Sequence, residues 1–431
     1  VGHQPVANSE HCSTGRAPLH ITVPVHSPSR GQKPIIIGHQ DDGSAQEVII
    51  RLSRRPLGFI PMAHPTDQPT ALVIGGTGPT GPSIVHGLEA RGHRVTVFHT
   101  GRHELDEVAH VEHIHGDPFS KEGVVNAVGD RTFEVVVACY GRLRTIAEVL
   151  AGRCGRFISV GGTPAYQGYF DPTRFDPVGL PVPTGENAPR SGEDDDGKSY
   201  RVARTEDLVF EHQPNAIHLR YPFVYGPRQI APLDWSIVRR ILDRRPAIIV
   251  PEAGLMAETR SYSENAAHVV LCAVDTPTAG GRCFNVGDEE SLTISQRIAL
   301  ICSELSHDME IVGMPTDLAL PARPLMMQVE PGHRILDLSA TRDVLGYRDL
   351  VPAREAVGIA ARWLSDNPLE PGGTQETVLE DPFDYVQEDR LLDWWRSATA
   401  NPPDLDYPDE PGYGAYYSGP GTSRRRSDTR I

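Results

Sequence analysis

Cysteine, long hydrophobic runs and clustered positive charge are scarce in this sequence. Its six cysteines are scattered over 431 residues with neither a Cys-x-x-Cys pair nor a metal-like Cys/His spacing, so we predict no metal ligand. No apolar run reaches the ~20 residues of a membrane helix, and the amino terminus lacks the regions of a secretory signal. The net charge of −16 argues against a nucleic-acid partner, because phosphate backbones are held by Lys and Arg. We therefore expect a cytoplasmic protein that acts on a small molecule, without a membrane partner.

The most informative stretch joins a buried strand to a turn rich in glycine. It reads Ala-Leu-Val-Ile-Gly-Gly-Thr-Gly-Pro-Thr-Gly over 71–81, and it places glycines three residues apart. Such a turn bends sharply, brings its backbone to a pyrophosphate and packs the next helix on its strand. A helical pattern over 81–91 and a strand over 94–98 follow, which favours a dinucleotide site over a tight turn that binds nothing. The residues assigned to this site are Gly75, Thr77, Gly78, Pro79, Thr80 and Gly81.

Composition divides the chain into four parts. Residues 1–66 are rich in Pro, Ser, His, Gln and Gly and are interpreted as a disordered extension, with Met62 hypothesised as the natural start. Residues 67–230 alternate apolar runs with helical patterns, which predicts an α/β fold with a Rossmann-type doubly wound parallel sheet, completed by later segments. Residues 231–368 predict a smaller C-terminal α/β substrate lobe. Residues 369–431 predict a helix and a tail rich in Pro, Gly and Tyr.

The expected elements follow the apolar periodicity. In the first domain the predicted strands are 71–75, 94–98, 111–115, 133–138, 156–160 and 215–220, and the predicted helices are 81–91, 120–128, 142–152 and 199–212. In the smaller lobe the predicted helices are 234–243, 264–274 and 293–306, and the predicted strands are near 247–250, 282–286 and 310–313. A last helix over 388–398 is expected to pack on the body through Trp394 and Trp395.

Together with the glycine turn, the motif Arg220-Tyr-Pro-Phe-Val-Tyr-Gly-Pro-Arg228 resembles the extended short-chain dehydrogenase/reductase family, the NAD-dependent epimerase/dehydratase group. The resemblance runs from about Leu72 to Pro368. It implies that Asp117 ends the third strand and contacts the adenine, and that Tyr140 ends the fourth strand beside the cofactor. It further implies an epimerase-like or oxidoreductase activity on a hydroxyl or carbonyl group, with sugars as the commonest substrates, and a homodimer through helices 142–152 and 199–212.

The residues after the second strand bear on the choice of cofactor. NAD sites place an acidic residue there, whereas NADP sites place an arginine near the 2′-phosphate. This chain has Phe-His-Thr-Gly-Arg-His over 98–103, with no acid before Glu104. We therefore predict NADP bound through Arg102, with NAD as the alternative. Arg102 could also be a solvated loop residue.

The catalytic residues depart from the pattern of the family. The family uses a tyrosine that transfers a proton, with a lysine four residues later, and the candidate here is Tyr200 followed by Arg204. Arginine is planar and always charged, so it is not equivalent to lysine. The expected Ser or Thr position is a glycine, which leaves Thr163 or Ser159 to hold the reacting oxygen. A member that only binds or senses a dinucleotide is the alternative, and RNA binding is less favoured.

Three arginines are candidates for substrate contacts. Arg142 follows the fourth strand, near the expected nicotinamide, and could equally be a first-turn helix residue. Arg228 and Arg260 stand where the resemblance implies cationic contacts to substrate phosphates, a task that suits a bidentate guanidinium.

Overall fold

The computed structural model describes residues 68–407, apart from 327 and 329. The expected extension over 1–66, Met62 and the tail beyond 407 lie outside these residues. Within the described part, no helix is both long and apolar enough to cross a bilayer.

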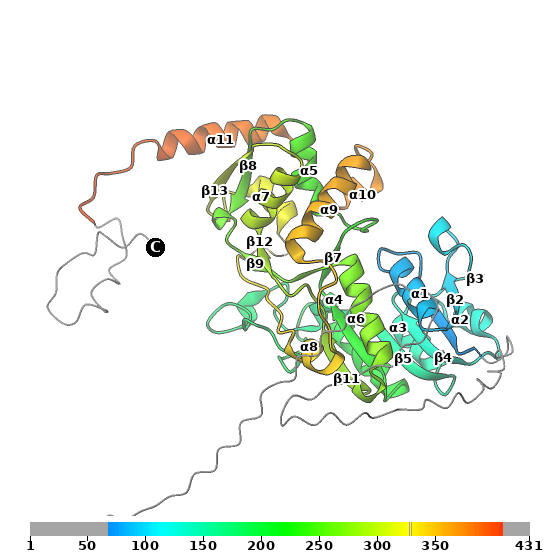
Figure 1. Ribbon diagram of the computed structural model, residues 1–431. Helices are drawn as coiled ribbons and strands as arrows, with labels where there is room; N and C mark the ends of the chain where they lie inside the picture. The colour runs from blue at the N-terminus through cyan, green and yellow to red at the C-terminus, as the bar shows by residue number, and fades with distance from the viewer. Residues whose placement is uncertain (1–67, 327, 329, 408–431) are drawn as a thin grey trace, which may run out of the picture. The chain divides into compact units, whose positions relative to one another are not determined.

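Seven parallel strands form the central sheet, in the order β3-β2-β1-β4-β5-β6-β11 (Figure 1). The strands are β1 (Thr70–Ile74), β2 (Arg94–His99), β3 (Glu112–His115), β4 (Phe133–Ala138), β5 (Cys154–Gly162), β6 (Ile217–Tyr221) and β11 (Arg282–Asn285). The order reverses between β1 and β4. A crevice at the carboxyl ends of the strands beside such a reversal is where open α/β sheets bind ligands.

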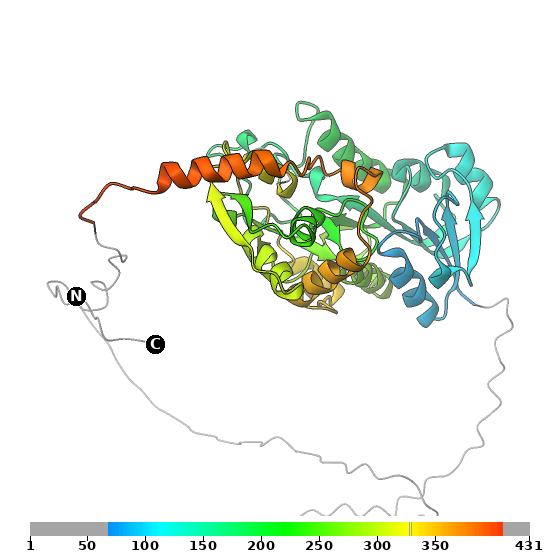
Figure 2. The same cartoon turned by 90° about the horizontal axis from the view of Figure 1, so that it is seen from above.

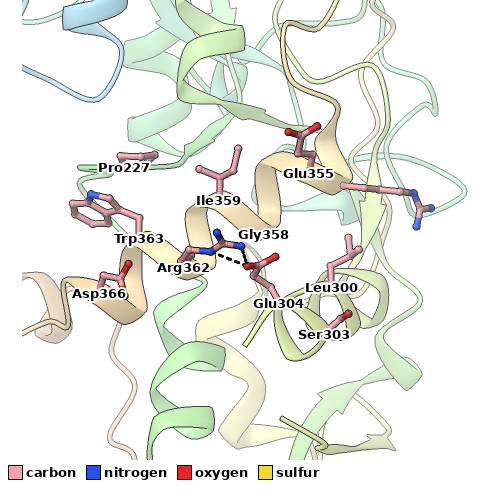
Figure 3. Close-up of a pocket in the computed structure, with 11 residues that line it drawn as sticks. Pro227, Leu300, Ser303, Glu304, Glu355, Gly358, Ile359, Arg362, Trp363 and Asp366 are labelled. Atoms are coloured by element: carbon pink, nitrogen blue, oxygen red, sulfur yellow. Dashed lines mark hydrogen bonds and ion pairs between the residues drawn. The ribbon is translucent and has the colours of Figure 1, made fainter. Parts of the chain in front are cut away.

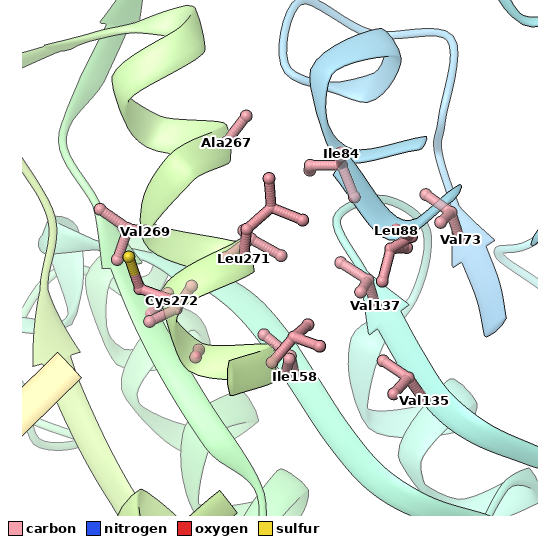
Figure 4. Packing of buried hydrophobic residues seen from close by; sticks show 14 of the residues in the cluster. Val73, Ile84, Leu88, Val135, Val137, Ile158, Ala267, Val269, Leu271 and Cys272 are labelled. Carbon is pink, nitrogen blue, oxygen red and sulfur yellow. The ribbon is translucent and has the colours of Figure 1, made fainter. Parts of the chain in front are cut away.

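Helices cover both faces of this sheet, which explains the near-continuous apolar strands. Ala71 and Val73 of β1 pack towards α1 (Gly81–Ala90) and α6 (Ser263–Asp275), whose Leu88 and Leu271 lie in the same apolar cluster (Figure 4). The alternate residues Leu72 and Ile74 pack with α2 (Lys121–Val128), α3 (Leu143–Val149) and α4 (Gly197–His212). Because successive side chains of a strand point to opposite faces of the sheet, alternate residues of each strand pack into two different cores.

The smaller lobe has its own core. Strands β8 (Ala247–Pro251) and β13 (Glu310–Met314) pair in parallel, and apolar residues of α5 (Trp235–Leu242), α7 (Ile294–Glu304) and α9 (Ala353–Asp366) pack with them. Short ladders join β7 (Phe223–Tyr225) to β10 (Arg260–Tyr262) and β9 (Ala257–Glu258) to β12 (Leu292–Thr293). The remaining helices are α8 (Ser339–Leu345), α10 (Thr374–Thr377) and α11 (Tyr385–Thr399).

Two elements that we placed in the smaller lobe belong to the main sheet. The expected helix 264–274 is part of α6, and the expected strand 282–286 is β11, which pairs with β6. The placement was wrong because the chain leaves the lobe after β10 and returns to the open edge of the sheet. Alternating helices and strands do not distinguish the two destinations.

The C-terminal helix α11 lies along the smaller lobe (Figure 2). Buried Arg240 of α5 donates to Asp381 at 2.7 Å and also to Glu388 of α11. Trp395 packs against the cluster of β8 and β13, as expected, whereas Trp394 is 52% exposed. The expectation that Trp394 packs on the body was therefore wrong, because the apolar face of α11 takes only one of the two neighbouring rings.

A buried ion pair attaches α4 to the sheet. Arg220 of β6 donates to the two oxygens of Glu206 at 2.9 and 2.6 Å, and Arg190 donates to the same carboxylate at 3.0 Å. Burial alone raises the pKa of Glu206, but the hydrogen bonds and charge of Arg220 outweigh it and lower the value to about 2. His218 lies 3.5 Å from Glu206, and burial lowers its pKa to about 4. His218 is therefore neutral near pH 7.

We expect Glu206→Gln to lower the free energy of unfolding at pH 7 by roughly 3–5 kcal/mol, because it leaves buried guanidinium groups without their counter-charge. The pKa of Glu206 is below its ordinary 4.5, so its contribution is complete above pH 4.5 and is lost as the pH falls towards 2. Urea denaturation at a series of pH values should show a weaker acid dependence in the variant. Glu211→Gln, on the exposed side of the same helix, is the control. Equal losses in both variants would contradict a special role for Glu206.

Candidate functional site

The glycine turn lies between β1 and α1, as the spacing predicts. Gly75 has φ +94°, and a Cβ there would lie 2.4 Å from Cβ of Tyr140 at the end of β4. A Cβ at Gly81 would lie 2.0 Å from the carbonyl oxygen of Gly76, so only glycine lets α1 start this close to the turn. At Gly78 the nearest atom is 3.7 Å away. Two glycines are thus required by packing, whereas the third leaves its backbone accessible.

The start of α1 leaves few backbone donors free, because Gly81 N–H donates to the Gly78 carbonyl, Ile84 N–H donates to the Thr80 carbonyl, and Pro82 has no N–H. Thr80 is the N-cap residue, and its side chain makes no capping hydrogen bond, so the N–H of Ser83 is the first-turn donor without a partner among the described residues. The first N–H groups of a helix have no partner within the helix, and its dipole is positive there. Thr77 and Pro79 are partly exposed in the same turn. This end of α1 is therefore suited to an anionic group such as a pyrophosphate.

The predicted adenosine contacts lie at the neighbouring strand ends. Arg102 is exposed in the loop that follows β2. Asp117 is exposed after β3, and its carboxylate accepts a hydrogen bond from the backbone N–H of Phe119 at 2.9 Å. Glu104 lies 3.0 Å from His115, so the first acid after β2 is already engaged.

A cavity of about 470 Å³ lies at the carboxyl ends of β4 and β5, between the beginnings of α3 and α4. Gly141 and Gly162 form part of its floor, and Phe119 contacts Tyr140 edge-on with ring centroids 5.0 Å apart. The cavity thus begins next to the tyrosine that lies against Gly75. Its cationic side chains are Arg142, Arg144, Lys198 and Arg201.

The cavity is basic, although the protein as a whole is acidic. Its lining includes no Asp or Glu. Among the described residues, none lies close enough to these four cationic groups to form an ion pair with them. All four side chains are exposed, and the Lys198 ammonium lies 4.9 Å from the centre of the Phe170 ring, so the cavity has a cationic excess that is open to solvent. Such an excess is compatible with an anionic ligand.

The predicted catalytic pair does not face this cavity. The face of α4 that lines it carries Lys198, Arg201, Val202 and Thr205, at the 3–4 residue spacing of one helix side. Tyr200 is not among the residues on this side of the helix. Its hydroxyl donates to Glu193 at 2.8 Å, and this hydrogen bond raises the pKa of Tyr200. Arg204 is exposed. Tyr200 and Arg204 are therefore not among the residues that line this cavity, and their catalytic roles stay a prediction.

Neither hydroxyl candidate lines the cavity. Ser159 is fully buried in β5, where its hydroxyl lies 2.8 Å from Nδ1 of His218. Thr163 is 1% exposed and begins a 3-10 turn directly after β5. His218 reaches the cavity wall, so Ser159 touches the site only through this histidine. Both hydroxyl-bearing residues are buried and do not line the cavity.

The other two predicted substrate arginines are already paired. Arg228 donates to both oxygens of Glu107 at 2.9 and 3.1 Å. Arg260 is 9% exposed and donates to Asp234 and Glu258. Of the three predicted arginines, only Arg142 lines the basic cavity.

Four residues of the cavity lining were not predicted: Arg144, Lys198, Arg201 and His218. Arg201 stands on the predicted helix 199–212 and Lys198 lies one residue before it, and the available signal was their 3–4 residue spacing with Val202 and Thr205. His218 gave no local signal, because only the pairing of β6 with β5 brings it under the cavity.

A second cavity, of about 630 Å³, lies in the smaller lobe between α7 and α9 (Figure 3). Arg362 of α9 pairs with Glu304 of α7 on its wall. The charged residues of its lining are the three carboxylates Glu304, Glu355 and Asp366 and the two arginines Arg354 and Arg362, so this cavity has no cationic excess.

No family model matches the chain. A 3-diazoavenalumate denitrifying reductase from Streptomyces sp. is 27% identical over 272 residues, which cover 58% of this chain and 84% of the reductase. Among solved structures, the UDP-glucose 4-epimerase of Thermotoga maritima, determined with UDP-glucose, has a TM-score of 0.56 at 18% identity and covers 69% of this chain and 99% of its own.

Two further solved structures contain NAD. The UDP-glucuronic acid 4-epimerase of Bacillus cereus has a TM-score of 0.52 at 14% identity and covers 69% of this chain and 99% of its own. The dTDP-glucose 4,6-dehydratase of Bacillus anthracis has a TM-score of 0.53 at 14% identity and covers 70% and 97%. The chain therefore has the fold of the NAD-dependent epimerases and dehydratases of the extended short-chain dehydrogenase/reductase family, which its motifs resemble.

Proposed function

We propose that this protein is a nicotinamide-dinucleotide-dependent oxidoreductase that reduces a small anionic substrate in the basic cavity between α3 and α4. The observation that carries the proposal is the set of four unpaired cations around this cavity, next to the glycine turn. A carboxylate or phosphate of the substrate would pair with Arg142, Arg144 or Arg201. Bidentate guanidinium contacts suit both groups and fix their orientation.

The glycine turn and the start of α1 would hold the pyrophosphate of the dinucleotide. Tyr140, between Gly75 and the cavity, would border the nicotinamide end. The dinucleotide supplies the hydride. Exposed Arg102 favours a 2′-phosphate, and therefore NADP, because Glu104 is engaged by His115. The NAD bound in related structures keeps NAD as the alternative.

Reduction fits the cavity better than epimerisation. An epimerase must remove a hydroxyl proton and return it, a task that the resemblance gives to a tyrosine, and no tyrosine lines this cavity. Lys198 is the amine on its wall, and its ammonium lies over the Phe170 ring at 4.9 Å from the centroid. Turned into the cavity, this ammonium would polarise or protonate the acceptor as the hydride arrives. The Streptomyces relative is named as a reductase, which is consistent with this direction.

Loss of the Tyr–Lys pair also favours a second candidate, a protein that binds a dinucleotide without turnover. This second candidate predicts tight binding of NADP(H), with no oxidation of NADPH in the presence of any substrate. A panel of keto acids, aromatic carboxylates and sugar phosphates distinguishes the two candidates.

We expect Gly78→Ala to weaken NADPH binding by about 10-fold or more, because the added methyl group lies where the backbone must approach a phosphate. Nothing in the structure lies within 3.7 Å of that methyl group, so thermal stability should stay close to the wild-type value. Gly81→Ala is the contrast, since its Cβ collides with the turn and should destabilise the fold. Calorimetric titration with NADPH and NADH measures both effects and the preference between them. Unchanged affinity in Gly78→Ala would contradict the assignment of the turn.

We expect Lys198→Met to lower turnover of the best anionic substrate at least about 100-fold, because the group that polarises the acceptor is lost. Arg201→Met should mainly raise KM. Tyr200→Phe is the matched control on the same helix turn, and turnover should stay within about twofold, since its hydroxyl meets Glu193 instead of the cavity. Steady-state NADPH oxidation and NADPH affinity are measured for all three variants. Loss of turnover in Tyr200→Phe alone would overturn this assignment.

A further inference from the structure

Three histidines and one glutamate converge at the ends of β2 and β3. His99 ends β2, His113 and His115 lie on β3, and Glu104 lies in the loop between the two strands. The ligand atoms of these four side chains all lie within 4.8 Å of one another. The sequence analysis predicted no metal ligand, because it searched for close Cys/His spacings.

The sheet register produces this convergence. His99 is paired with His115 across the parallel strands, and His113 lies two residues earlier on β3. Residues two apart on a strand share a face, so all three imidazoles are on the same side of the sheet edge. The loop then directs the carboxylate of Glu104 towards them.

The separations match those of ligands around one small ion. His99 Nε2 lies 2.8 Å from His113 Nδ1, and the oxygens of Glu104 lie 3.0, 3.6 and 3.8 Å from His115, His113 and His99. Bonds of about 2.0–2.2 Å in a tetrahedral zinc site put neighbouring ligand atoms roughly 3.3 Å apart. The observed separations lie on both sides of that distance.

The surroundings orient these side chains as ligands. His113 donates from Nε2 to the carbonyl oxygen of Val108 at 2.8 Å, an outer hydrogen bond that leaves Nδ1 directed at the cluster. The side chain of His99 is 4% exposed, so it forms the buried side of the cluster. His115 and Glu104 are 57% and 54% exposed, so the cluster is open to solvent on one side.

We propose that His99, Glu104, His113 and His115 form a binding site for one divalent transition-metal ion, with zinc as the best match to three imidazoles and one carboxylate. The ion takes the place of the hydrogen bond between His99 and His113, and the His99 proton moves from Nε2 to Nδ1, so both imidazoles stay neutral. It links the ends of β2 and β3 and fixes the loop over 100–105, which carries Arg102. The site needs neither the cofactor nor the substrate.

The test is a titration of the chelator-treated full chain with Zn²⁺ and Co²⁺, followed by calorimetry, thermal unfolding and the visible spectrum of cobalt. The wild-type chain should bind one ion per chain at this site, with a higher Tm and a tetrahedral cobalt spectrum. His115→Gln and Glu104→Gln should each bind at least about 100-fold more weakly, since loss of an outer hydrogen bond alone costs 10- to 100-fold. Both side chains are half exposed, so these variants should fold.

Two controls separate this site from other histidines of the chain. His103→Gln changes an exposed histidine in the same loop and should keep the wild-type spectrum and the rise in Tm. His110→Gln removes a member of the exposed group of His86, Glu89 and His110 on the neighbouring surface and should keep them too. The proposal is overturned if no ion binds, if the ligand variants bind as tightly as the wild-type chain, or if the controls lose the signal as well.

Discussion

The buried pair of Glu206 and Arg220 is the interaction on which the geometry of the site depends. It joins the middle of α4 to β6 and therefore sets the rotation of α4 about its own axis. With Glu206 directed at the sheet, Lys198 and Arg201 face the cavity and Tyr200 faces the loop that carries Glu193. A buried carboxylate is stable there only because two arginines satisfy it. The ion pair thus decides which side chains of α4 line this cavity.

This dependence explains why the position of the glycine turn could be predicted from the sequence, whereas the side chains of α4 that line the cavity could not. The turn is local, since strand, glycines and helix follow one another in the sequence. The pair at 200 and 204 has the spacing of one helix face, but so has the pair at 198 and 202. The spacing of two residues along a helix does not show how that helix is rotated about its own axis. The partner that sets the rotation is Arg220, on another strand.

The same limit applies to the other differences. The strand order follows from alternating elements as far as β6, but β11 reaches the sheet edge only after an excursion into the smaller lobe. The histidines of β2 and β3 are far apart in the sequence, and strand register brings them together. Arg228 and Arg260 stand in suggestive motifs, yet tertiary contacts give each of them a carboxylate partner. In each case a contact between distant segments decides the outcome.

The distribution of charge supports the same reading of the cavity. With 57 acidic residues against 41 basic ones, carboxylates are in excess, and the buried arginines Arg220, Arg240 and Arg297 each pair with an acidic partner. The four cations around the basic cavity are exposed instead and form no ion pair within the described residues. Clustered like charges repel one another, so this arrangement costs stability unless an anion binds there. The field of the surrounding acidic surface opposes the approach of such an anion, and the low-dielectric walls of the cavity strengthen the attraction once it enters. The four cations are exposed and solvated in the free protein, so an anionic substrate remains the proposal that their clustering supports.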